Sequence, residues 1–176
     1  FLGVLAVVFI GPYQSEAGKI SVTITNRAQM AQISPAATYP GLTKRVGTFA
    51  PGEPWSYGPL GLVNFFRPLS PDDVQGALGA RWARSLGAKT VYVLSDEEAY
   101  GRGIANVFEA TAKRLGLAIV ANEDIDGRRP DQKTVIAKIA ASGADLVYMG
   151  GSAETGAQTI LRDMKAAGLV APRVRF

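Results

Sequence analysis

The sequence contains neither cysteine nor histidine. Without these residues the chain has no thiolate or imidazole ligand for zinc, no disulfide framework, no thiol nucleophile and no histidine-dependent triad or general base. Most common hydrolytic and metal-dependent chemistry is thereby excluded, and we expect neither a metal site nor a catalytic centre. The lack of cysteine does not identify a redox compartment, because cytosolic and exported bacterial proteins can both lack it.

Long apolar runs are also missing, since the apolar stretch at residues 1–10 is far shorter than the ~20 residues that span a bilayer. No basic segment precedes this stretch and no small-residue cleavage site follows it, which argues against a signal peptide. A run rich in Val, Ile and Leu is typical of a buried parallel strand, and we predict one at residues 4–10. Because the chain starts inside this run without an initiator Met, we expect residues upstream, including any export signal.

Clustered positive charge is scarce as well. The 19 basic and 15 acidic residues give a formal net charge of +4, and they are scattered along the chain. A nucleic-acid-binding surface needs a basic face or stripe, whereas only Lys44-Arg45 and Arg128-Arg129 form basic pairs. We therefore predict no nucleic-acid partner and an ordinary solvated surface.

Glycine marks the ends of the predicted helices from residue 70 onward. Each of four glycines follows a stretch with helical apolar spacing, where a C-cap needs the left-handed conformation: Gly87, Gly116, Gly143 and Gly168. Short apolar runs follow these glycines or precede the next helix, and they are typical of buried strands: residues 90–94, 117–120, 146–149 and, more weakly, 174–176.

The helices between these strands are amphipathic. The first begins at Ser70-Pro71-Asp72-Asp73, which combines an N-cap serine, a proline at the first helical position and acidic residues near the positive end of the helix dipole. The others carry apolar faces: Ile104, Val107, Phe108 and Leu115, then Val135, Ile136 and Ile139, then Ile160, Leu161 and Met164. This alternation predicts an α/β fold with parallel, doubly wound sheets covered on both faces.

The chain is organised differently before residue 70. A helix from about residue 15 to 31 follows the first strand, and a short strand at residues 32–34 follows the helix. Residues 35–64 are rich in Pro and Gly, and an irregular stretch of this length tends to be functional or to connect lobes. We predict a boundary near residues 68–70, with one part at residues 1–69 and a second at residues 70–176.

Two polar turns follow the first two predicted strands. The turn Gly11-Pro-Tyr-Gln-Ser15 leads into a helix, so the backbone N–H groups around Ser15 would attract an anion such as a carboxylate. The segment ending at Thr38 follows the next strand, and the carboxyl ends of parallel strands meet at the sheet edge where open α/β sheets bind ligands. We expect the two turns to be neighbours. An N-cap role for Ser15 and a turn-forming role for Thr38 remain the alternatives.

The segment Tyr100-Gly-Arg-Gly103 opens a helix after a strand, as a dinucleotide-binding loop would. The match is poor, because Asn106 stands at the third glycine position and the acidic turn at residues 95–99 would repel a pyrophosphate. The adjacent carboxylates Asp72-Asp73 and Glu97-Glu98 have no spacing that suggests acid–base catalysis, and we interpret them as capping or solvated groups.

Four motifs together resemble the type I periplasmic binding proteins for branched-chain amino acids, the leucine-binding family of ABC importers. They occur in the family's order and at its approximate spacing: Ile33-Ser-Pro-Ala-Ala-Thr-Tyr-Pro-Gly-Leu-Thr43, Phe65-Phe-Arg-Pro-Leu-Ser-Pro-Asp-Asp-Val-Gln-Gly76, Val91-Tyr-Val-Leu-Ser-Asp-Glu-Glu-Ala-Tyr-Gly-Arg-Gly103 and Leu146-Val-Tyr-Met-Gly-Gly151. The resemblance implies a two-lobed fold that is incomplete at both ends in this chain, with about 60 upstream residues absent.

The resemblance also implies a set of ligand-binding residues. Ser15 and Thr38 match the serine and threonine that hold the α-carboxylate, and Ala36 matches the residue whose carbonyl receives the ammonium group. Tyr100 matches a tyrosine that the second lobe brings over the ligand, and Asp72 matches an acidic residue near the hinge. One further position, Ser152, falls close to a pocket residue of the family although the local spacing differs.

The function implied is capture of a small amino acid, or of an amide or urea, by hinge closure, without a cofactor or enzymatic turnover. The partners implied are that ligand and the membrane permease of an ABC transporter, on the extracytoplasmic side of the membrane. The segment at residues 46–62 is longer than in the best-known members, which leaves the ligand open. A ligand-sensing receptor or regulator of the same fold is the alternative, because fold does not settle function, and a doubly wound NAD-dependent enzyme is the third.

Overall fold

In the computed structural model, residues 6–45 and 50–176 are described. The chain divides into two compact units, residues 1–72 and residues 73–176. The division predicted after residue 69, and the assignment of the two parts to separate lobes, stay predictions.

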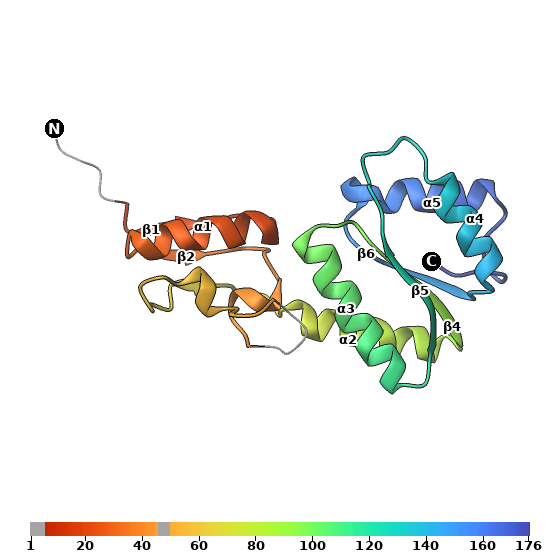
Figure 1. Cartoon of the computed structure of the whole chain (residues 1–176), viewed down its shortest axis with the longest axis horizontal. Coiled ribbons are helices and arrows are strands. Elements are labelled where there is room, and N and C mark those ends of the chain that lie inside the picture. The colour runs from red at the N-terminus through yellow and green to blue at the C-terminus, as the bar shows by residue number, and fades with distance from the viewer. Residues whose placement is uncertain (1–5, 46–49) are drawn as a thin grey trace. The chain divides into compact units, whose positions relative to one another are not determined.

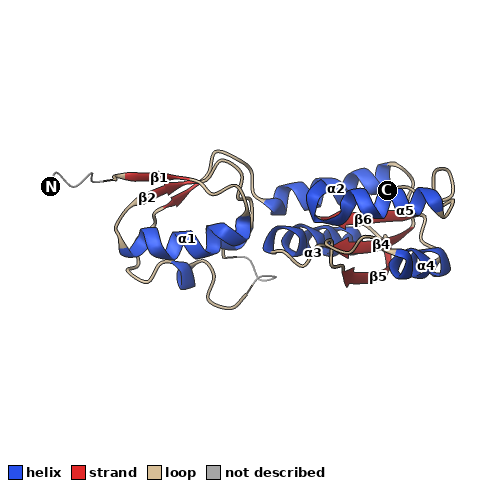
Figure 2. Ribbon diagram, turned by 90° about the horizontal axis from the view of Figure 1, so that it is seen from above, coloured by secondary structure: helices blue, strands red, loops and turns tan. Residues whose placement is uncertain are grey.

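The first unit contains a parallel three-stranded sheet in the order β1-β2-β3. The elements are β1 (Val8–Ile10), α1 (Ser15–Arg27), β2 (Ala31–Ile33), two 3₁₀ turns (Pro40–Leu42 and Trp55–Tyr57) and β3 (Phe65–Phe66). Val8 pairs with Ala31, and Gln32 pairs with Phe65. Figure 2 shows α1 along one face of this sheet. The helix ends at Arg27 rather than near residue 31, because Ala31 is the first residue of β2.

The first strand is shorter and more exposed than the sequence predicts. It covers residues 8–10, and the part of the predicted strand before residue 6 lies outside the described residues. Val8 is 39% exposed, Phe9 is 37% exposed and Ile10 is 72% exposed, so the expectation of a buried strand is wrong. The reason is that burial of a strand needs cover on both faces, whereas among the described residues α1 covers one face of the sheet.

A buried network of amide and hydroxyl groups locks α1 to the strands. The Thr25 hydroxyl donates to Gln32 Oε1 at 2.8 Å and accepts from Asn64 Nδ2 at 3.0 Å. Asn26 Nδ2 in turn donates to Asn64 Oδ1 at 2.9 Å. Because buried polar groups are stable only when hydrogen-bonded, this network fixes how the helix lies on the sheet.

The second unit is a doubly wound α/β unit, as predicted. Its elements are α2 (Asp72–Ser85), β4 (Thr90–Ser95), α3 (Ala99–Arg114), β5 (Ala118–Asp124), α4 (Lys133–Ser142), β6 (Leu146–Gly150), a π-helical turn (Ala153–Ala157) and α5 (Gln158–Ala166). The strands are parallel in the order β5-β4-β6. In Figure 1, α2 and α3 lie on one face of the sheet, and α4 and α5 lie on the other. The weakly predicted strand at residues 174–176 forms only a parallel bridge between Arg175 and Leu146.

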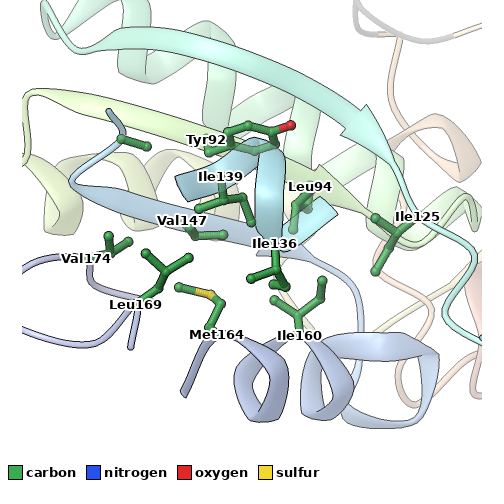
Figure 3. Close-up of a cluster of buried hydrophobic side chains, with 11 residues drawn as sticks. Tyr92, Leu94, Ile125, Ile136, Ile139, Val147, Ile160, Met164, Leu169 and Val174 are labelled. Carbon is green, nitrogen blue, oxygen red and sulfur yellow. The ribbon is translucent and has the colours of Figure 1, made fainter. Parts of the chain in front are cut away.

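Each face of this sheet has its own hydrophobic core. On one face Phe108 is fully buried and its ring stacks on Tyr148 at a centroid distance of 3.7 Å. On the other face, side chains from α4 and α5 converge on β4 and β6, as Figure 3 shows for Ile136, Ile160 and Met164. Leu161 was expected on this buried face but is 50% exposed, because it lies about 100° around the helix from Ile160.

The predicted helix ends are confirmed. All four glycines adopt left-handed φ angles, which are 81° at Gly87, 81° at Gly116, 72° at Gly143 and 70° at Gly168. A residue with a Cβ is strained in that conformation, so glycine at these positions stops each helix and turns the chain toward the next strand.

Candidate functional site

The two polar turns of the first unit are neighbours, as predicted. The Ser34 hydroxyl donates to the carbonyl of Pro12 at 2.7 Å, and the Tyr39 amide donates to Ser15 Oγ at 3.1 Å. These two bonds join the loop after β1 to the loop after β2 at the carboxyl edge of the sheet. The arrangement is the one that places ligands in open parallel sheets.

The amino terminus of α1 points its free N–H groups into this region. Gln14, not Ser15, occupies the N-cap, and no side chain makes a capping hydrogen bond there. The first backbone hydrogen bond at the start of the helix runs from the Gly18 amide to the Gln14 carbonyl at 3.0 Å. The amides of residues 15–17 come before this bond and have no backbone partner within the helix. Such amides, together with the helix dipole, favour a bound anion.

Thr38 and Ala36 offer two further polar groups beside this helix end. Thr38 as a residue is only 9% exposed, and its hydroxyl has no hydrogen-bond partner among the residues that the structure describes. The carbonyl of Ala36, which is half-buried, likewise has no partner within the described ranges. A hydroxyl and a carbonyl without internal partners at a loop edge are available to bind a ligand.

The backbone around Thr38 is fixed from several sides. Arg67 Nη1 donates to the carbonyls of Ala37 at 3.0 Å and Tyr39 at 2.8 Å. The amide of Asp72, a fully buried residue, donates to the Thr38 carbonyl at 3.0 Å. Asp72 is therefore not a solvated group. The Thr38 hydroxyl is presented by a backbone that has little freedom to move, as a pre-organised binding group requires.

A buried glutamate, which sequence reasoning missed, supports the same segment. Glu53 is 6% exposed and accepts a hydrogen bond from the Tyr39 hydroxyl at 2.8 Å. Burial, followed by this bond and the negative charge of Glu53, raises the pKa of Tyr39 well above its usual value. The same causes raise the pKa of Tyr57, whose hydroxyl also donates to Glu53. No sequence signal marks Glu53, because it lies in an irregular segment without periodicity.

In the second unit, the loop after β4, which leads into the start of α3 at Tyr100, meets the loop after β6, which carries Ser152. The Asp96 amide donates to the Gly150 carbonyl at 3.1 Å, and Thr155 Oγ1 donates to the Asp96 carboxylate. A Cβ at Gly101 would lie 2.6 Å from the Gly150 carbonyl oxygen, so the two loops can approach this closely only with glycine there. The loops after β4 and β6 thus form one edge of the sheet.

Tyr100 is half-buried, and its hydroxyl accepts from Gln75 Nε2 at 3.3 Å. Ser152 is also half-buried and caps the π-helical turn that leads into α5, where its amide donates to Thr155 Oγ1 at 2.8 Å. Nearby, the Asp124 carboxylate lies 2.7 Å from Arg102 Nη2. Burial acts to raise the pKa of Asp124, but hydrogen bonds from Ser95 and Arg102 outweigh it and lower that pKa.

The six predicted residues therefore fall into two groups. Ser15, Ala36, Thr38 and Asp72 are brought together in the first unit. In the second unit, Tyr100 lies at the start of α3 and Ser152 lies on the neighbouring loop after β6. Their role in ligand binding stays a prediction.

The first unit also has a small apolar pocket between α1 and the segment at residues 54–65. Its volume is about 100 Å³, whereas pockets that bury a small-molecule ligand are usually ~300 Å³ or larger. It is lined by Val22, by Leu42 and Thr43, and by residues of the segment that ends at β3, and we assign no ligand to it. Within residues 6–45 and 50–176, no group of three or more acidic side chains is placed to hold a metal ion.

Within the described ranges, no helix combines the length and the apolar character that crossing a membrane requires.

Comparison with known proteins gives a consistent result. Residues 6–176 match the protein family described as periplasmic binding protein. An amino acid binding protein of Pseudomonas aeruginosa is 30% identical over 167 residues, which are 94% of this chain and 40% of that protein. A leucine-, isoleucine-, valine-, threonine- and alanine-binding protein of the same species is 31% identical over 78% of this chain and 33% of its own length. The chain therefore spans well under half of these relatives.

Solved structures show the same architecture. An ABC transporter substrate-binding protein from Desulfitobacterium hafniense, solved with leucine, is 25% identical with a TM-score of 0.69 over 92% of this chain and 44% of that chain. A solute-binding protein from Rhodopseudomonas palustris, solved with p-hydroxybenzoic acid, has a TM-score of 0.79 over 96% of this chain and 42% of that chain. The latter is 16% identical, so it supports the fold alone.

Proposed function

Because the chain belongs to the periplasmic binding protein family, we propose that it forms part of the solute-binding component of an ABC importer. The component captures a small amino acid or an amino-acid-like ligand, such as a branched-chain amino acid, an amide or a urea, by hinge closure. Relatives named for binding leucine, isoleucine and valine support branched-chain amino acids as the first ligands to test.

One observation carries the choice of ligand class. The start of α1 offers unpaired backbone N–H groups, and the Thr38 hydroxyl beside it has no partner in the described structure. These donors suit a carboxylate, because charge-assisted hydrogen bonds to N–H and O–H groups are strong in a site that excludes water. The free carbonyl of Ala36 suits an ammonium group nearby, and an α-amino acid carries both groups on one carbon.

The remaining residues complete the proposed mechanism. Ser15 Oγ accepts from the Tyr39 amide, so the Ser15 hydroxyl hydrogen can be donated to the ligand carboxylate. Tyr100 and Ser152 belong to the part that closes over the ligand, and Asp72 lies next to the Thr38 carbonyl near the hinge. Closure excludes water and yields the form that a membrane permease recognises on the extracytoplasmic side. No covalent chemistry is part of this function.

A thermal-shift screen of the complete protein against the twenty amino acids, simple amides and urea tests the proposal. A ligand that binds only the folded state stabilises it by ~2.7 kcal/mol at a hundredfold excess over its dissociation constant. We expect a rise in the unfolding midpoint with leucine, isoleucine or valine that disappears in a Ser15→Ala, Thr38→Ala double variant. No rise with any compound would contradict the proposed ligand class.

A further inference from the structure

Glu53 is a buried charge held by three side chains from different parts of the first unit. Tyr39 and Tyr57 each donate a phenol hydrogen to its carboxylate, to Oε2 at 2.8 Å in the case of Tyr39. Lys19 Nζ lies 3.7 Å from Glu53 Oε1 and 4.2 Å from the centre of the Tyr39 ring. Burial of a carboxylate is unfavourable unless it is paired and hydrogen-bonded, so these contacts are what stabilise Glu53 in its buried position.

One of these partners, Tyr39, follows Thr38 directly. Its amide donates to Ser15 Oγ at 3.1 Å, and its carbonyl accepts from Arg67 at 2.8 Å. Tyr39 therefore forms hydrogen bonds through its amide, its carbonyl and, with Glu53, its side-chain hydroxyl. The peptide that joins Thr38 to Tyr39 is therefore oriented by contacts at both ends of Tyr39, and Glu53 holds the end that is farther from the site.

The Glu53 carboxylate is closely packed against Gly41 and the Tyr39 ring. A Cβ at Gly41 would lie 2.1 Å from Glu53 Oε2 and 2.4 Å from a ring carbon of Tyr39. The segment that carries Glu53 is thus seated directly on the chain that follows Thr38. A shift of the carboxylate would be passed to the Tyr39 ring rather than absorbed, because closely packed interiors transmit displacement.

We propose that Glu53 is a positioning residue for the ligand site. It does not touch the ligand. Through the Tyr39 hydroxyl it fixes the Thr38–Tyr39 peptide, and with it the direction of the Thr38 hydroxyl and the contact with Ser15 at the start of α1. The segment around residue 53 thereby contributes to ligand affinity through Tyr39. The effect of Glu53 on ligand affinity rests on the proposed function, whereas its effect on the order of the Thr38 segment does not.

The test compares three variants of the complete protein. Tyr39→Phe removes the hydroxyl that links Glu53 to the site, and Glu53→Gln removes the charge. Tyr92→Phe is the matched control, because the Tyr92 hydroxyl makes the same kind of bond to Glu123 at 2.5 Å from a buried strand of the second unit. All three variants should lower the unfolding midpoint, so a loss of stability alone does not distinguish a positioning role from a structural one.

The first distinguishing readout needs no ligand. We expect hydrogen exchange at the Tyr39 amide, measured by NMR well below the unfolding midpoint, to be at least about tenfold faster in Tyr39→Phe and Glu53→Gln and unchanged in Tyr92→Phe. Unchanged exchange at this amide in the first two variants would overturn the proposal.

The second readout is leucine affinity by calorimetry at the same temperature. The dissociation constant should rise on the order of tenfold in Tyr39→Phe and Glu53→Gln and stay at the wild-type value in Tyr92→Phe. Equal effects in all three variants would overturn the positioning role. If the wild-type protein binds neither leucine nor the other compounds screened, the proposed function fails, and the exchange measurement still decides whether Glu53 orders the Thr38 segment.

Discussion

Replacing Thr38 with valine separates ligand binding from folding. Thr38 is 9% exposed. Valine keeps the branched shape and replaces only the hydroxyl, which has no partner among the described residues. The folded protein therefore loses no internal hydrogen bond, and we expect the unfolding midpoint to change little. The ligand loses a hydrogen bond to its carboxylate, and a bond to a charged group contributes about 1.5–3 kcal/mol.

That free energy corresponds to an increase of about 10- to 150-fold in the dissociation constant for leucine. Isothermal titration calorimetry on the complete protein measures it directly. Thr25→Val is the opposite control, because the Thr25 hydroxyl is bonded to Gln32 at 2.8 Å and to Asn64 at 3.0 Å in a buried network. Thr25→Val should lower the stability by about 1–3 kcal/mol and leave leucine affinity unchanged. Wild-type leucine affinity in Thr38→Val would show that the Thr38 hydroxyl does not bind the ligand carboxylate.

Three further outcomes follow from the structure. Phe108→Ala should destabilise the protein by about 3–5 kcal/mol in chemical denaturation, since it leaves a cavity under Tyr148. Gly101→Ala should lower the unfolding midpoint measured by circular dichroism, because its Cβ would lie 1.9 Å from Asp96 Oδ1. The pKa values of Tyr39, Tyr57 and Tyr92 are raised above that of a free tyrosine, so ultraviolet titration should show tyrosines that ionise well above pH 10. Their contribution to the free energy of unfolding should be complete below pH 10 and should be lost as the pH rises through the raised pKa values. Ionisation of every tyrosine near pH 10 would be the contrary result.

The helix ends and buried residues of the second unit could be predicted well, because they depend on residues that are close together in the sequence. A glycine in the left-handed conformation ends a helix whatever surrounds it, so Gly87 and Gly143 could be assigned from sequence alone. Helical spacing placed Ile136 and Ile139 in the core, and both are buried. The same rule failed at Leu161, because two adjacent residues cannot both occupy the centre of a narrow apolar face.

The first unit was harder to predict because its features depend on contacts between distant residues. The proximity of Ser15 and Thr38 followed from the rule that parallel strands end at one edge, and the bond from Tyr39 to Ser15 confirms that the turns meet. The role of Glu53 could not be predicted, since its bond to Tyr39 crosses 14 residues of irregular chain. No local pattern specifies such a pair.

The most direct test of the central claim is a crystal structure of the complete protein with the best ligand from the thermal-shift screen. We expect the ligand carboxylate to lie within hydrogen-bond distance of Thr38 Oγ1 and the first amides of α1, with the ligand ammonium group on the Ala36 carbonyl. A carboxylate bound elsewhere, with the start of α1 and Thr38 left empty, would contradict the proposed binding site.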